Sequence, residues 1–102
     1  MADFSDALRI TMSGMQAQST RLRLTAENIA NAETPGYHRK TVSFEAMAGD
    51  SGAVATGPVR LDRTAPERIH DPSNPLADAE GYVDGSNVNL LFEIADAREA
   101  SR

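Results

Sequence analysis

The sequence feature that most limits the fold is a helix-length stretch that ends at Pro35-Gly36. Residues 3–33 contain no proline and one glycine, and then a proline and a glycine stand side by side. Proline fixes φ, removes a backbone donor and disfavours the α conformation in the preceding residue, while glycine accepts a positive φ, so a helix has to end here. Asn28 and Asn31 can bond the backbone groups left free at a helix end. The stretch predicts a helix of about eight turns followed by a tightly specified turn.

The predicted first helix carries apolar residues at seven-residue intervals along two lines. The first line is Leu8, Met15, Leu22 and Ile29, and the second line is Ile10, Ala17 and Leu24. A strict seven-residue repeat drifts by about 20° per heptad around a helix, so the first line forms a gently winding seam of the coiled-coil type. The second line falls on nearly the opposite side of the helix. Two apolar faces need two neighbours, which favours a helix packed within an assembly over a single amphipathic helix with scattered surface leucines.

The middle of the chain has a different character. All five prolines and six of the seven glycines lie in residues 32–87. Alternating apolar residues predict a strand over 41–46, and residues 58–62 and 81–83 are two shorter candidates. Residues 49–57 are small and rich in glycine, so they are predicted to form a loop or a locally disordered segment.

A second helix is expected to begin at Asn87 or Val88. Val88, Leu91 and Ala95 share one of its faces with Phe92 at the margin, and Leu90, Ile94 and Ala97 share the other. We expect the two helices to bury one face against each other and to offer the remaining faces to other subunits. The predicted assembly interface therefore comprises both lines of the first helix together with Val88, Leu91 and Ile94.

The fold class predicted from these patterns is mainly α. N- and C-terminal helices would form a discontinuous coiled-coil-like domain with a small irregular β insertion between them. The expected parts are an N-terminal helix over 1–33, a loop-rich β insertion over 34–87, and the start of a C-terminal helix over 88–102. A chain of 102 residues with 5% aromatic content buries little surface by itself. We therefore expect the isolated chain to be poorly ordered until it assembles.

Composition and motifs argue against several classes of function. A net charge of −5 without a basic block gives no electrostatic footprint for nucleic acid. The chain has no cysteine, and its two histidines, His38 and His70, have no metal-ligand spacing. There is also no phosphate-binding loop and no nucleophile elbow. We predict no enzymatic activity, no cofactor, no metal site, no nucleic-acid partner and no small-molecule substrate.

Four side chains in the insertion invite more specific predictions. Arg39 and Lys40 form the densest positive patch, which could meet an acidic groove on a neighbouring subunit or remain as solvated charges beside a strand. Tyr37 and Tyr82 each follow a glycine, and both are predicted to pack in the core.

Two stretches of the chain resemble a known protein family. Residues 28–37 resemble the N-terminal signature of bacterial flagellar axial proteins, which are the rod, hook and hook-associated subunits. Residues 71–83 and 87–89 are similar to the proximal rod subunits of the flagellar basal body. The motif positions are Asn28, Ala30, Asn31, Thr34, Pro35, Gly36, Tyr37, Asn74, Pro75, Gly81, Tyr82 and Asn87. Ser86 departs from the family pattern, which has proline there, so we expect a less rigid entry to the last helix.

The resemblance implies a structural subunit of the drive shaft that transmits motor torque to the hook. Its partners would be other flagellar rod proteins, further copies of itself in a helical lattice, and the rod base with its membrane-ring adaptor. Its place would be the periplasmic rod of the basal body, reached through the flagellar type III export apparatus without a cleaved signal peptide. Two alternatives stay open: another flagellar rod subunit, and a soluble coiled-coil adaptor or export partner.

The lengths of the two predicted helices differ. A helix from Val88 to Arg102 has about four turns, half the length of the first helix. The resemblance implies further helical turns after Arg102. We expect either additional chain or a helix from another subunit to cover the rest of the seam.

Overall fold

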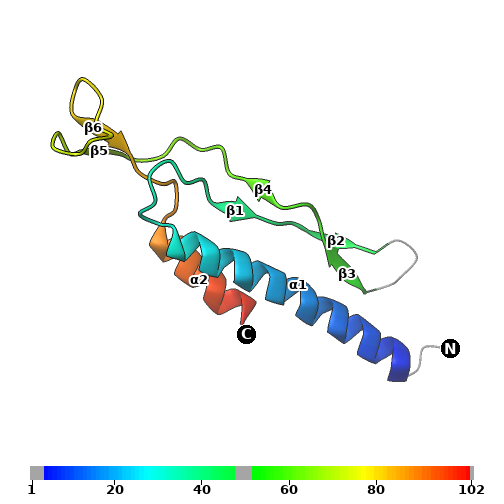
Figure 1. Ribbon diagram of the computed structural model, residues 1–102. Helices are drawn as coiled ribbons and strands as arrows, with labels where there is room; N and C mark the ends of the chain where they lie inside the picture. Colours follow the sequence, from blue (N-terminus) through cyan, green and yellow to red (C-terminus); the bar gives the residue numbers. More distant parts are fainter. Residues whose placement is uncertain (1–3, 48–51, 102) are drawn as a thin grey trace.

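The computed structural model describes residues 4–47 and 52–101 (Figure 1). Along the chain, six short strands, β1 to β6, lie between an N-terminal helix, α1, and a C-terminal helix, α2. Their bounds are α1 Phe4–Ala30, β1 Lys40–Thr41, β2 Phe44–Ala46, β3 Val54–Thr56, β4 Arg60–Leu61, β5 Arg68–His70, β6 Tyr82–Asp84 and α2 Leu90–Ala100. The architecture therefore consists of a long N-terminal helix and a short C-terminal helix with small antiparallel sheets between them.

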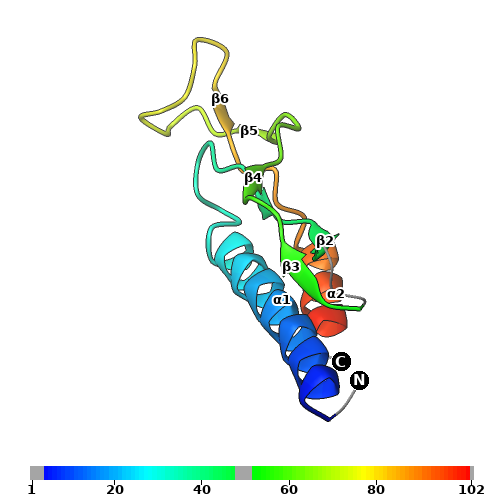
Figure 2. The ribbon, with the colours of Figure 1, turned by 90° about the vertical axis from the view of Figure 1, so that its right-hand side faces the viewer.

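The strands pair as three separate two-stranded antiparallel ribbons, β1–β4, β2–β3 and β5–β6. Thr41 lies opposite Arg60 in the first ribbon, Glu45 opposite Ala55 in the second. The first two ribbons follow one another along α1, whereas the β5–β6 hairpin projects beyond the end of the helices (Figures 1 and 2). The hairpin is consequently free of the helices on most of its surface.

The molecule is elongated and has a very small core. It measures 67 × 23 × 15 Å, and its radius of gyration is 18.6 Å, whereas a compact chain of this length has a radius of about 13 Å. It exposes 7263 Å², whereas a compact protein of 10.9 kDa exposes about 5,600 Å². The buried apolar side chains are Ala17, Leu24, Ala53, Val83 and Ala100. Three of these five are alanine, so this shape depends little on burial within the described part of the chain.

Helix α1 confirms the predicted first helix but ends three residues before the predicted bound. After Ala30 the amide of Asn31 is shared between the carbonyl oxygens of Glu27 and Asn28, at 3.1 and 3.2 Å, so the last turn tightens before the chain leaves the helix. Gly36 has a φ of 73°, as its position after proline predicts. The sequence also predicts Asp3 as the N-cap of this helix, with Asp6 three residues on, but Asp3 lies outside the described residues.

The strand predictions were correct in part. The candidates at 58–62 and 81–83 contain β4 and overlap β6, but the single strand over 41–46 is two strands, β1 and β2. The prediction of a loop over 49–57 was wrong for residues 54–56, where β3 lies and pairs with β2, while residues 49–51 lie outside the described part of the chain. Strand β5 was missed. These strands have two or three residues each and are mostly exposed, so no apolar alternation marks them.

Helix α2 begins two to three residues later than expected and turns a polar face to α1. Asn89 is the N-cap, and its side-chain oxygen accepts from the amides of Leu91 and Phe92. The two helices lie side by side, and α2 covers only the C-terminal part of α1 (Figures 1 and 2). The prediction that an apolar stripe of α2 packs on α1 was wrong. Glu93 and Ala100 are buried on that side instead. Of the predicted apolar residues, Val88 and Ala97 are half-buried, and the others remain exposed.

Candidate functional site

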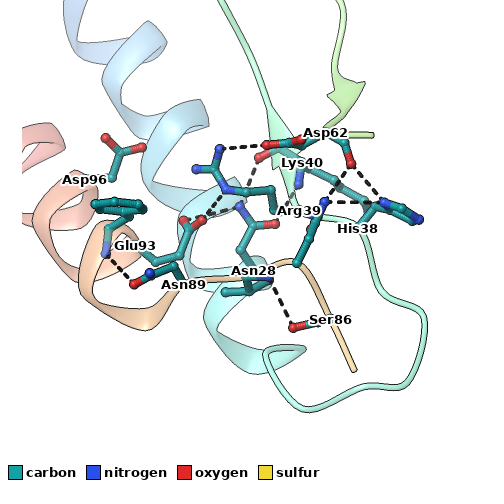
Figure 3. Close-up of polar contacts among 12 residues, drawn as sticks. Asn28, His38, Arg39, Lys40, Asp62, Ser86, Asn89, Glu93 and Asp96 are labelled. Carbon is teal, nitrogen blue, oxygen red and sulfur yellow. Dashed lines mark hydrogen bonds and ion pairs between the residues drawn. The ribbon is translucent and has the colours of Figure 1, made fainter. Parts of the chain in front are cut away.

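The best-defined site is the place where the end of α1, residues 31–41, β4 and the start of α2 meet, which we call the joint (Figure 3). Its members are Asn28, the turn at 34–37, Arg39, Lys40, Asp62, Ser86, Asn87 and Glu93. Side chains from these distant segments converge on one another through hydrogen bonds and ion pairs. The joint sets the path of the chain from the first helix into the second.

Asn28 is the centre of the joint and is 1% exposed. Its Nδ2 donates to the carbonyl oxygen of Lys40 at 2.9 Å, and its Oδ1 accepts from the amide of the same residue at 2.8 Å. The side chain therefore satisfies both the N–H and the C=O group of Lys40, as the backbone of a paired antiparallel strand would. Oδ1 also accepts from the hydroxyl of Tyr37 at 2.9 Å, and Nδ2 contacts Glu93 Oε2 at 3.3 Å. Few other side chains could supply a donor and an acceptor in this geometry.

Glu93 on α2 is fully buried and forms an ion pair with Arg39. Arg39 Nε lies 2.6 Å from Glu93 Oε1, and its Nη1 lies 3.7 Å from Asp62 Oδ2. Burial by itself would lower the pKa of Arg39, but the hydrogen bond and charge of Glu93 outweigh this and raise it. Glu93 was not among the residues predicted from the sequence. The available signal was its position as the one charged residue inside the apolar run 90–95.

Asn87 and Ser86 connect the start of α2 to the turn. Asn87 Oδ1 accepts from the amide of Arg39 at 2.6 Å, and its Nδ2 donates to the carbonyl oxygens of Asp62 and Thr64. The Ser86 hydroxyl donates to the carbonyl oxygen of Ala32 and accepts from the amide of Val88. The hydroxyl of the buried Ser86 thus restrains this segment by two hydrogen bonds, and the expectation of an entry to α2 less rigid than proline would give stays a prediction.

The turn itself is closed by local hydrogen bonds. The amide of Thr34 donates to the carbonyl oxygen of Asn31 at 3.0 Å, and the amide of Tyr37 donates to that of Thr34 at 3.1 Å. The Thr34 hydroxyl donates to Asn31 Oδ1, and Asn31 Nδ2 donates to the carbonyl oxygen of Glu27. The amide of Gly36 then reaches the carbonyl oxygen of Gly85 at 3.0 Å, which ties the turn to the chain before α2.

Lys40 forms an ion pair with Glu27, and this contact lowers the pKa of Glu27 through the hydrogen bond from Lys40. Arg39 is paired with Glu93 and Asp62, as described above. Within the single chain both basic side chains are therefore paired with its own carboxylates, and they remain partly exposed, at 23% for Arg39 and 33% for Lys40. The two sequence-based alternatives for this patch, a neighbour's acidic groove or solvated charges, stay predictions.

The second motif lies apart from the joint, on the β5–β6 hairpin. Tyr82 is 37% exposed, so the prediction that it packs in the core was wrong. Its ring lies 4.9 Å from the guanidinium of Arg68, and His70 approaches its edge with centroids 4.9 Å apart. Tyr37, in contrast, is half-buried, and burial raises its pKa. Asn74 and Pro75 lie in the loop that joins the two hairpin strands.

The predicted assembly residues divide between buried and exposed positions. Ala17 and Leu24 are buried inside the chain, and Ile10 and Val88 are half-buried. The exposed members are Leu8, Met15, Leu22, Ile29, Leu91 and Ile94, with exposed fractions between 36% and 78%. Phe4, Met12 and Phe92 extend this exposed apolar surface. The seam and the outer face of α2 are therefore open in the single chain.

A groove of about 500 Å³ continues this surface along α1 past the end of α2. Ile10, Gly14, Leu22 and Ala100 are among its lining residues. Gly14 leaves open space beside the helix backbone. Gln18 also lines the groove, and its Oε1 is buried without a hydrogen-bond partner in the described part of the chain. The groove thus contains an unsatisfied acceptor as well as apolar surface.

The described residues offer little for chemistry. Within residues 4–47 and 52–101 no group of three or more His, Cys, Asp and Glu side chains could hold a metal ion. Neither described helix is both long and apolar enough to cross a membrane. The acidic and basic side chains of the joint bind one another, so its arrangement serves to fix the chain.

Comparisons with known proteins agree with the two motifs. Residues 8–38 match the family model of the flagella basal body rod protein. The flagellar basal-body rod protein FlgC of Agrobacterium fabrum is 45% identical, over 100% of this chain and 81% of that protein. FlgC of Aquifex aeolicus is 38% identical, over 100% of this chain and 82% of that protein, and FlgC of Escherichia coli O6:H1 is 38% identical, over 91% and 76%. The chain therefore belongs to the family of FlgC-type flagellar basal-body rod proteins.

Proposed function

We propose that this chain is a structural subunit of the proximal rod of the bacterial flagellar basal body. With other axial proteins it would form the shaft that transmits motor torque to the hook. One observation carries the proposal beyond family membership. Both helices present large apolar side chains to solvent, while only five small or medium apolar residues are buried among the described residues. Monomeric proteins rarely leave contiguous apolar surface of this kind uncovered.

The exposed seam of α1 is the proposed contact with neighbouring subunits. Leu8, Met15 and Leu22 are spaced by seven residues and are all exposed, so a second helix could pack along them in the coiled-coil manner. The outer face of α2, with Leu91 and Ile94, provides a second such surface. These residues, together with Ile10, Ile29, Val88 and the buried pair Ala17 and Leu24, form the proposed assembly interface.

The groove beside Gln18 supports the same proposal. A groove on α1 that combines apolar side chains with Thr11, Ser19 and an unsatisfied acceptor suits a helix that brings a donor group. We propose that it is covered by helical chain in the assembled rod. Residues 1–33 and 88–102 would then act as the helical part of the subunit, and residues 34–87 as the part that fixes its orientation to neighbours.

The proposed partners follow from the family. They are further copies of this chain in a helical lattice, other rod proteins, and the rod base with its membrane-ring adaptor. We also propose that the chain reaches the periplasmic rod through the flagellar export apparatus without a cleaved signal peptide. It would act mechanically, with no catalytic step of its own.

The direct test is co-purification with the basal body. Tagged protein, expressed in cells that lack the endogenous protein, should restore motility and remain with purified basal bodies through acid and detergent washing. A tagged protein of unrelated function, expressed at the same level, controls for carry-over. Loss of the tagged chain in the washes, with motility unrestored, would contradict the proposed function.

A further inference from the structure

The β5–β6 hairpin has many internal hydrogen bonds, although Val83 is the one buried apolar side chain among its described residues. Across its loop the amide of Asp71 donates to the carbonyl oxygen of Gly81 at 2.8 Å, and the amide of Asp78 donates to that of Tyr82 at 2.9 Å. Asp78 Oδ1 accepts from the amides of Glu80 and Tyr82 at 2.9 and 3.0 Å. Hydrogen bonds therefore hold the loop where apolar burial does not.

Contacts between exposed side chains also stabilise the hairpin. Arg68 forms an ion pair with Asp78 and stacks on Tyr82. Gly81 has a φ of 88°, and a Cβ there would lie 3.3 Å or less from Pro72. A loop that is ordered before it binds loses less conformational entropy on binding. An exposed segment with this much internal bonding is suited to docking.

The surface of the hairpin is acidic and carries one strongly exposed apolar side chain, Leu76. Residues 66–86 carry five acidic side chains and one basic, whereas the rest of the described chain carries eight of each. Leu76, in the loop, is 69% exposed. Glu80 and Asp84 have no side-chain partner in the described part of the molecule. A fitting partner surface would combine unpaired basic side chains with apolar ones.

Residues 59–63 of this same chain have that combination. Arg60 and Arg63 are exposed, and neither pairs with an acidic group among the described residues. Val59 and Leu61 are 50% and 49% exposed. Arg98 is also exposed and unpaired within those residues, but its neighbours in sequence are an alanine and a glutamate, so it has no large apolar side chain beside it.

We propose that the hairpin of one copy docks on residues 59–63 of a second copy. Leu76 would contact Val59 and Leu61 of that copy, and the acidic side chains would face its two arginines. The hairpin projects past the end of the helices, whereas β4 lies alongside α1 (Figures 1 and 2). Two different patches would therefore meet, a heterologous contact that repeats from copy to copy and suits a ring or a helical lattice. This inference rests on the proposed function.

The absence of cysteine from the chain allows a direct test. Cells would co-express two separately tagged copies, Leu76→Cys and Val59→Cys, and purified basal bodies would be treated with a short bismaleimide crosslinker. We expect a crosslinked species that contains both tags and the peptides around positions 76 and 59. As a control, Arg23→Cys replaces Val59→Cys, because Arg23 is exposed, lies on α1 and is not part of the proposed seam. This pair should give at least tenfold less of the two-tag product.

The outcomes separate the inference from the proposed function. If both cysteine variants are present in basal bodies but the 76–59 product does not exceed the control, the docking proposal is wrong and the rod function stands. Crosslinking of Leu76→Cys to a different rod protein in place of the second copy would also overturn it. If neither variant is found in basal bodies and wild-type chain is also missing, the proposed function itself fails.

A charge-reversal series provides a second readout. Glu80→Arg should lower incorporation into basal bodies severalfold, and adding Arg63→Glu in the same chain should restore part of the loss because the opposed charges are exchanged. If adding Arg63→Glu lowers incorporation further, the two substitutions act independently, and this result would contradict the pairing.

Discussion

The joint and the outer surfaces of the two helices are stabilised in opposite ways. In the joint, Asn28 and Glu93 are almost completely buried and their polar atoms are bonded to other segments. Along the seam and on the outside of α2, large apolar side chains such as Met15 and Leu91 lie in solvent. The difference shows which part of the structure the chain completes by itself. Hydrogen bonds fix the direction in which the helices leave the joint, and apolar surface is left for neighbours.

The largest expected effect follows from a charge placed in the seam. Leu22→Asp should reduce incorporation into basal bodies by at least tenfold and abolish motility, because a carboxylate in a packed apolar interface is costly. Arg23→Ala, at the adjacent exposed position, should change incorporation less than twofold. Quantitative immunoblotting of purified basal bodies measures both. Equal losses for the two variants would mean that the seam does not face a neighbour.

A smaller effect is expected when the buried ion pair of the joint is broken. Glu93→Gln removes the nearer charged partner of Arg39 and leaves Asp62 at 3.7 Å, and removal of one member of a buried pair costs about 3–5 kcal/mol. Arg39 is 23% exposed, so we expect a value of about 2–3 kcal/mol. Hydrogen exchange of the α2 amides within the rod should report this loss of protection. Glu33→Gln, at an exposed carboxylate near the joint, is the matched control and should leave α2 unchanged.

The two asparagines of the turn motif should differ in importance. Asn28→Ala leaves the backbone groups of Lys40 without their side-chain partner, at a cost of about 1–3 kcal/mol. Asn31→Ala loses one bond to the carbonyl oxygen of Glu27 and one from Thr34, at a partly exposed site, and should cost about 0.5–1.5 kcal/mol. The same exchange measurement, read at residues 37–41, ranks the two. A larger effect at Asn31 would contradict the central place given to Asn28.

The smallest effect concerns the pH dependence of the hairpin. Backbone hydrogen bonds, first that of Tyr82, lower the pKa of Asp78 below its ordinary value of 3.8. A lowered pKa means that the ionised carboxylate stabilises the folded hairpin above that value, and that this contribution disappears as the pH falls further. The ring resonances of Tyr82 should therefore shift toward unfolded values below pH 3.8, and Asp78→Asn should shift them at neutral pH. An unchanged Tyr82 spectrum in Asp78→Asn would contradict this role.

The sequence predicted the two terminal helices with an irregular β region between them, and it placed the end of α1 and the start of α2 to within three residues. Pro35 and Gly36 fix the turn by backbone sterics, which act locally and are legible in sequence. The inner face of α2 was predicted wrongly, because it is Glu93 that packs against α1, and the ion pair that makes this possible joins residues 54 positions apart. Strand β3 was missed because its three residues are only partly covered and follow a glycine-rich stretch. Local patterns identify elements, whereas long-range polar partners decide how they pack.

The measurement that tests the central claim most directly is hydrogen exchange of the free chain compared with the chain in purified basal bodies. The claim is that neighbours complete the apolar surfaces of the helices. It predicts that amides of residues 4–16 exchange rapidly in the free chain and are protected at least a hundredfold more in the rod, while the gain at residues 28–41 is smaller. Strong protection of residues 4–16 in the free monomer, with no further gain in the rod, would contradict it.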